Sequence, residues 1–193
     1  MTRPRLLAAL VVLAAATVHA KPGPEHLRLT AMCGTWDAEM TFWLRPGGAG
    51  IPSKATSTIT SLFDGTFIEE KIEGTLNGTP FTTLSWTGYN TDRKVYEATR
   101  IASTNTIRIA ETGVFDEKAG QFDLKADYLM AGDTWHQRTV IQQSSADAMV
   151  ATSYLSFGAV PEWKAVEIKY TRRATEITPG VISGAVQPKL LPE

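Results

Sequence analysis

The stretch Met32–Leu44, MCGTWDAEMTFWL, decides the fold class of this 193-residue chain. Over 35–44 its residues follow a period of two, and the apolar even positions are Trp36, Ala38, Met40, Phe42 and Leu44. Successive side chains of a β-strand point to opposite faces, so the alternation predicts a strand with one apolar face. The Gly-Thr-Trp step at its start predicts that Trp36 closes one end of a barrel.

Similar short runs follow, separated by turn residues. The expected strands are 35–44, 54–63, 66–74, 80–89, 94–102, 106–115, 121–129, 134–143, 148–157 and 163–173. Asp64-Gly65 and Asn77-Gly78 are typical of tight hairpins, whose central residues need positive φ. Connections this short favour an antiparallel up-and-down meander. Because an open meander would expose two long edges, we predict an all-β fold: a closed barrel of about ten strands.

The two ends of the chain differ from this β pattern. Residues 1–20 carry a basic start, the apolar run LLAALVVLAAATV and a Val-His-Ala cleavage site, which together predict a secretory signal peptide. The alternative is a retained amino-terminal anchor. The segment 21–33 begins a short helix at Pro24, because proline suits the first helical position. We therefore expect one barrel domain over 34–173, and a proline-containing tail over 174–193.

Composition limits the function further. Cleavage after Ala20 would remove two arginines and no acid, leaving a formal charge of 17 − 20 = −3. Such mild acidity gives no electrostatic basis for binding nucleic acid. No later apolar run approaches membrane-spanning length, so we expect a soluble protein in the periplasm or outside the cell. Cys33 is the only cysteine, which excludes an intramolecular disulfide and is typical of a small buried side chain.

The last expected strand predicts a partner for Trp36. Val166, Ile168, Tyr170 and Arg172 share one face of that strand. If the barrel closes, this strand lies beside the first, and the Arg172 guanidinium can stack on the Trp36 indole as a structural pair at the barrel end. The alternative is that Arg172 is a solvated residue at the end of a strand.

Polar residues on both faces of several strands indicate that part of the interior is wet or pairs its charges, since burying such groups dry is costly. The candidates for a ligand cavity are Trp86, Arg100, Glu111, Tyr128, His136, Arg138, Tyr154 and Tyr170. An amphiphilic ligand could place an anionic or polar head against Arg100 or Arg138. The competing interpretation is an internal salt-bridge network that only sets the strand register.

Patterns for other chemistry are missing from the sequence. No His/Cys cluster has metal-ligand spacing, and no nucleophile motif or phosphate loop occurs. His136 is a single unsupported candidate ligand for haem. Glu69 and Glu70 alternate, so they cannot act as a pair and are interpreted as solvated charges. We expect no cofactor, no metal and no catalytic residue.

Four stretches carry a family resemblance: HLRLTAMCGTWDAEMTFWLRPG, LFDGTFIEE, GTPFTTLSWTGYN and AVEIKYTRR. Together they resemble DUF1579, a bacterial family of unknown function, over about residues 25–173. The resemblance implies a calycin-like barrel, of the kind found in lipocalins, fatty-acid-binding proteins and nitrobindins, and implies no activity. This chain departs from the family pattern at 100–103 (RIAS) and at Leu155.

The leading functional hypothesis is an exported, non-catalytic barrel that binds a small amphiphilic or apolar molecule. A second is a barrel with a filled interior that self-associates, for instance as a homodimer, or binds a protein through Trp43 and Trp163. A third is a calycin-type enzyme, such as an isomerase, or a haem binder.

Overall fold

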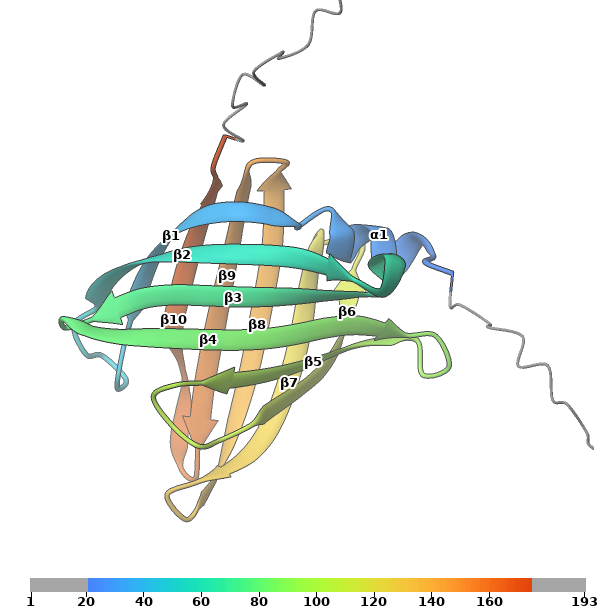
Figure 1. Cartoon of the computed structure of the whole chain (residues 1–193). Coiled ribbons are helices and arrows are strands. Elements are labelled where there is room, and N and C mark those ends of the chain that lie inside the picture. Colours follow the sequence, from blue (N-terminus) through green and yellow to red (C-terminus); the bar gives the residue numbers. More distant parts are fainter. Residues whose placement is uncertain (1–20, 175–193) are drawn as a thin grey trace, which may run out of the picture.

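The computed structural model describes residues 21–174, which form one closed antiparallel β-barrel with a short helix at one end (Figure 1). The elements are α1 (Pro24–Thr30), β1 (Gly34–Phe42), β2 (Ile51–Leu62), the 3₁₀ turn η1 (Phe63–Gly65), β3 (Phe67–Leu76), β4 (Thr79–Asn90), β5 (Val95–Ala102), β6 (Ile109–Asp116), β7 (Gln121–Met130), β8 (Asp133–Ser145), β9 (Ala148–Phe157) and β10 (Val160–Arg172). The signal peptide expected over 1–20 and nearly all of the expected tail lie outside the described residues.

Each strand pairs with its neighbours in the sequence, and β1 pairs with β10 to close the ring. The closing ladder runs from Trp36 opposite Arg172 to Phe42 opposite Val166. This confirms the predicted all-β, ten-stranded, up-and-down barrel with a short amino-terminal helix. Within residues 21–174, no helix is long and apolar enough to cross a membrane.

The alternation in β1 decides which side chains enter the core. Trp36, Ala38 and Met40 are buried, whereas Asp37 and Glu39 are exposed on the outer face. The hydrophobic effect fixes this register, because a slip of one residue would turn the apolar set outward.

Two predicted hairpins turn out differently. Asn77 and Gly78 make a two-residue turn with φ of 50° and 80°, as the sequence predicts. The predicted tight turn at Asp64-Gly65 is wrong, because η1 makes this connection longer: the ladder resumes only at Phe67, opposite Leu62. The Thr66 hydroxyl donates to the Phe63 carbonyl and stabilises the longer turn.

The strand expected over 106–115 begins three residues later, at Ile109. The Asn105 side chain accepts a hydrogen bond from the Ile107 backbone N–H at 2.9 Å, which holds the chain in a local turn. As a result β6 is short and Arg108 is exposed in the preceding loop.

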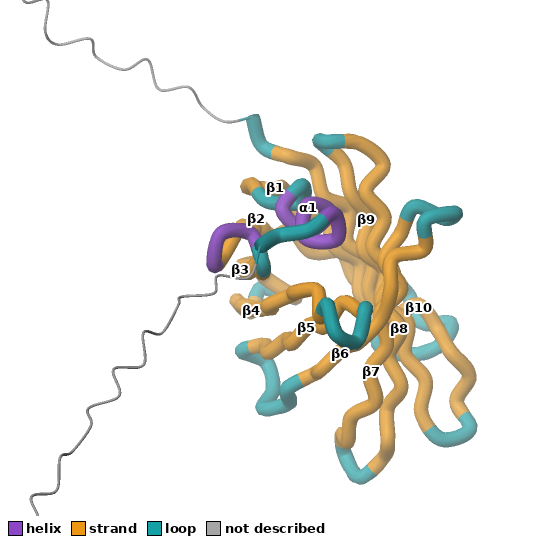
Figure 2. The backbone as a smooth tube through the Cα atoms, turned by 90° about the vertical axis from the view of Figure 1, so that its right-hand side faces the viewer, coloured by secondary structure: helices purple, strands orange, loops and turns teal. Residues whose placement is uncertain are grey.

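The helix α1 closes one end of the barrel, and Figure 2 shows it beside the ends of β1 and β2. Leu29 is 0% exposed, and Met32 just beyond the helix is also buried. His26 packs edge-on against Tyr89 with ring centroids 5.8 Å apart, and its Nδ1 accepts a hydrogen bond from the Gly23 N–H. The buried side chains of this short helix therefore cover the end of the barrel, which would otherwise be open.

Candidate functional site

The barrel end beside α1 is built around Trp36, whose side chain is completely buried. The Arg172 guanidinium lies over the indole, 4.0 Å from the ring centroid. The indole N–H donates to the Met32 carbonyl at 3.0 Å, and Tyr170 packs edge-on against the ring. Trp36 thus joins the end of α1 to the closing ladder.

Arg172 also satisfies backbone carbonyls at this end. Its guanidinium donates to Ala31, Cys33 and Ala146, the first two just after α1 and the third in the turn between β8 and β9. Two separate segments therefore converge on one side chain, and Arg172 is not the solvated strand-end arginine of the alternative interpretation.

Gly34 is required by this arrangement, and we expect Gly34→Ala to destabilise the fold. Its φ is +146°, and an added Cβ would lie 2.2 Å from Arg172 Nη1. Backbone strain at this φ and displacement of the Arg172 guanidinium by the added Cβ should together lower the free energy of unfolding by about 2–3 kcal/mol. Urea denaturation would measure this. Gly78→Ala has open space around its Cβ and is a control for positive φ alone. Equal losses in the two variants would contradict the proposed crowding.

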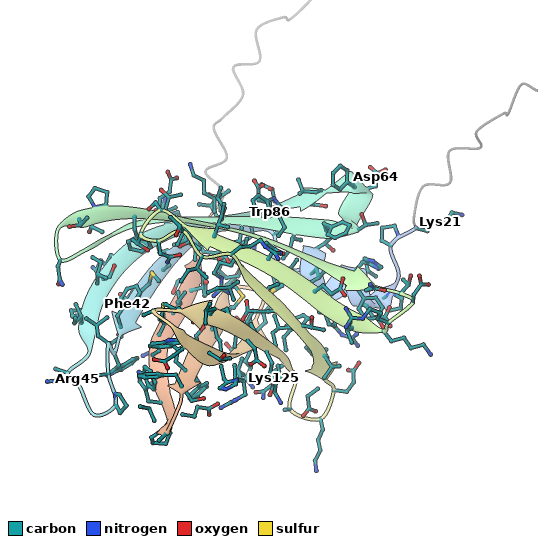
Figure 3. The ribbon with its side chains drawn as sticks, turned by 90° about the horizontal axis from the view of Figure 1, so that it is seen from below. Lys21, Phe42, Arg45, Asp64, Trp86 and Lys125 are labelled. Atoms are coloured by element: carbon teal, nitrogen blue, oxygen red, sulfur yellow. The ribbon has the colours of Figure 1, made fainter. Side chains whose placement is uncertain are left out.

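The barrel interior holds two adjoining chambers, which share part of their lining. The larger, about 220 Å³, extends toward the end opposite α1, and its walls include Phe42, Leu76 and Phe81. The smaller, about 50 Å³, lies against Leu29 and Met32. Figure 3 shows Phe42 at the far end of the barrel from Lys21, which precedes α1.

A group of polar side chains lies where the two chambers adjoin, because Glu70, Arg100 and Tyr170 line both. On one side of this group, Glu70 Oε1 accepts hydrogen bonds from the Ser57 hydroxyl at 2.7 Å and the Tyr170 hydroxyl at 3.1 Å. Burial, the largest cause, and the nearby Glu70 raise the pKa of Tyr170 well above its ordinary value. The phenol therefore stays protonated and acts as a donor.

On the other side of the group, the Glu111 side chain is 0% exposed. Its Oε1 accepts hydrogen bonds from the Thr139 hydroxyl and from Gln137 Nε2. Arg100 Nη2 lies 3.3 Å from Oε2, and the proximity of Glu111 raises the pKa of Arg100. The guanidinium is therefore charged. Its side chain remains 29% accessible, since it lines the cavity.

Four of the eight predicted cavity residues lie in the barrel interior. Arg100, Glu111 and Tyr170 line a chamber, and Tyr128 points to the same group, with its hydroxyl 3.4 Å from Gln137 Oε1. Whether these residues bind a ligand stays a prediction.

The other four need a correction, because they lie on the outer face. The Trp86 indole donates to Glu69 at 2.7 Å, and His136 is exposed with Nδ1 2.7 Å from Asp127. Arg138 binds Glu162 through two hydrogen bonds and lies over the Tyr154 ring. Each of these four residues is next in sequence to a residue that faces inward. Because both faces of their strands carry polar or aromatic side chains, the sequence did not show which face lies inside the barrel. The exposed His136, paired with a carboxylate, does not suit a haem pocket.

Sequence reasoning missed Glu70, which it interpreted as a solvated charge. Ile68 and Ile72 flank it two positions away, and both are buried on the inward face of β3. Period two therefore places Glu70 among them. The sequence signal that could have identified Glu70 is its place between two isoleucines on the apolar face of the strand.

Trp163 also differs from its expected role as an outer-face contact. Its indole N–H donates to the Trp43 carbonyl at 3.0 Å, and its ring packs edge-on against Trp135 and Phe157. These contacts are within the chain, where β10 is irregular next to β9 between Val160 and Val166. No group of three or more His, Cys, Asp or Glu side chains in residues 21–174 could hold a metal ion.

Comparison with solved structures supports the fold. The structure is similar to that of an S-type phycobiliprotein lyase from Guillardia theta, with a TM-score of 0.57 and 11% sequence identity. The match covers 79% of this chain and 94% of the lyase chain. Identity this low indicates a shared barrel fold alone. Comparison with curated proteins finds no match.

The sequence itself matches a family model over residues 21–172, which includes α1 and all ten strands. The match spans both the Gly34–Trp36 opening of β1 and Arg172 of β10, which lies opposite Trp36 in the closing ladder. This chain therefore belongs to DUF1579, a family described as proteins of unknown function.

Proposed function

We propose that this protein is an exported, non-catalytic binding protein that holds a small apolar or amphiphilic molecule inside its barrel. The observation that carries the proposal is the cavity of about 220 Å³, with apolar walls and polar side chains at its inner end. Apolar walls with a few convergent polar groups are typical of small-molecule sites. The barrel fold shared with the phycobiliprotein lyase is compatible with such a role.

The cavity volume limits the size of the ligand. An apolar cavity of about 150 Å³ is large enough to hold benzene, so this one fits a molecule of about ten non-hydrogen atoms. The alternative of a filled interior does not account for this space. An eight-carbon amphiphile such as octanol is therefore a suitable probe.

We expect octanol to bind the purified protein and Ala151→Phe to abolish binding, as measured by titration calorimetry. Ala151 lines both chambers, so a phenyl ring there fills the cavity. Thr152→Phe is the matched control, since the neighbouring residue of β9 points outward, and it should bind octanol normally. Binding by Ala151→Phe, folded as judged by its circular dichroism, would place the ligand elsewhere. Mass spectrometry of a solvent extract of gently purified protein would identify a natural ligand.

The proposal of export is supported by the basic and apolar pattern of residues 1–20. Amino-terminal sequencing of protein isolated from its native cells should give a chain that starts at Lys21. A chain that keeps residues 1–20 would instead indicate a retained anchor.

A further inference from the structure

The two chambers contain more negative than positive charge. Among the residues described, the charged side chains that line them are Glu70, Arg100 and Glu111. One guanidinium therefore has to balance the charge of two carboxylates. Glu111 is the largest cause of the raised pKa of Arg100 and Glu70 contributes to it, so the same positive charge is already shared between both acids.

One carboxylate oxygen of these charged side chains is not satisfied. Glu111 Oε2 is buried and accepts no hydrogen bond from the described residues, although Arg100 Nη2 is near enough for an ion pair. Oε1 of the same carboxylate accepts two hydrogen bonds. A buried acceptor without a donor is unfavourable, and such groups usually find a partner in water or a ligand.

We propose that the ligand carries a hydrogen-bond-donating head, a hydroxyl or an ammonium group, which binds at Glu111 Oε2 and beside Glu70, and that carboxylate heads are rejected. The inference rests on the proposed function and names the ligand class for the same cavity. The head occupies the smaller chamber, which Glu111 lines, and the apolar tail occupies the larger one.

Of the anionic and polar heads that the sequence suggested, this assignment keeps the polar head and drops the anionic one. Arg138 lies outside the barrel, and Arg100 is paired with Glu111. A ligand carboxylate would be a third negative group around one guanidinium, and like charges at short range in a poorly solvated site repel strongly. A hydroxyl or ammonium donor instead gives Glu111 Oε2 the hydrogen bond that it lacks.

The test compares octanol, octylamine and octanoate, which share a chain length and differ in the head group. Titration calorimetry with the full processed chain near neutral pH should show octanol and octylamine binding at least about ten-fold more tightly than octanoate. Ala151→Phe should abolish binding of every ligand that binds, which shows that each occupies the cavity.

The variant Glu70→Gln should change this preference. The glutamine carbonyl oxygen can still accept from Ser57 and Tyr170, while the net charge of the lining rises from −1 to zero. Octanoate should then gain about ten-fold in affinity relative to octanol. The matched control is Glu73→Gln on the outer face of β3, where Glu73 pairs with Lys71, and it should leave the preference unchanged.

The outcomes separate the two proposals. If none of the three amphiphiles binds, the proposed function is wrong. If octanoate binds as tightly as octanol in the natural protein, or Glu70→Gln leaves the preference unchanged, the head-group inference is wrong while the cavity remains a binding site. Should Glu70→Gln fail to fold, Glu111→Gln makes the same change of charge and is judged by the same criterion.

Discussion

Replacing Trp36 by alanine is expected to lower the free energy of unfolding by about 3–5 kcal/mol, the largest effect of any single substitution considered for this protein. The side chain is fully buried, and its loss would leave a cavity between α1 and the closing ladder. It would also remove the surface on which Arg172 lies. For a domain of this size, the melting temperature should fall by about 10 °C. Differential scanning calorimetry or thermal circular dichroism measures the change.

Trp86→Ala is the matched control for this experiment. Trp86 is only half-buried on the outer face, and its main polar contact is the hydrogen bond to Glu69. We expect a loss of about 1 kcal/mol. Similar losses in the two variants would contradict the view that Trp36 holds the barrel end together.

Arg100→Met is expected to cost about 3 kcal/mol near neutral pH, because it leaves the buried Glu111 carboxylate without its positive partner. Methionine keeps much of the arginine's apolar volume, so loss of packing contributes little. Urea denaturation of the variant and the natural protein would give the difference directly.

The loss caused by Arg100→Met should depend on pH. In the variant, an isolated buried carboxylate favours its protonated form, so the folded state binds more protons than the unfolded chain. Its stability therefore rises relative to the natural protein as the pH falls, and the difference should shrink in mildly acidic solution. A difference that is constant with pH would show that Glu111 is not the cause.

Arg138→Met is the control for this second experiment. Arg138 also pairs with a glutamate through its guanidinium, but Glu162 is 45% exposed and the pair lies on the outer face. Surface ion pairs contribute about 0–1 kcal/mol, so we expect a small loss. The two arginines were alike as sequence candidates, and their burial makes them different.

The strands and their order could be predicted because local patterns determine them. Alternation of apolar residues in β1, the Asn77-Gly78 turn and Pro24 at the start of α1 each depend on neighbouring residues alone. Where a side chain competes with the ladder, prediction failed. Asn105 holds the residues before β6 in a turn, and η1 extends a connection that the Asp-Gly pair predicts to be tight.

The sequence did not determine which of the candidate cavity residues face inward, and the reason is physical. Polar residues on both faces of a strand do not say which face is inside, and Glu111 and Arg138 each have a polar or charged neighbour within two positions. The barrel resolves this by bringing Arg100 of β5 against Glu111 of β6, and Tyr170 of β10 against Glu70 of β3. These partners are set by closure of the ring.

The sequence by itself determined an all-β chain with short connections, a buried tryptophan at the start and an arginine at the end that could meet it. Only the tertiary structure decided which charges face inward, how two carboxylates come to share one guanidinium, and how much space remains between them. The physical reason is the distance along the chain over which each feature is determined. Alternation and turns depend on a few adjacent residues, whereas the charge and volume of a cavity depend on all the strands around it.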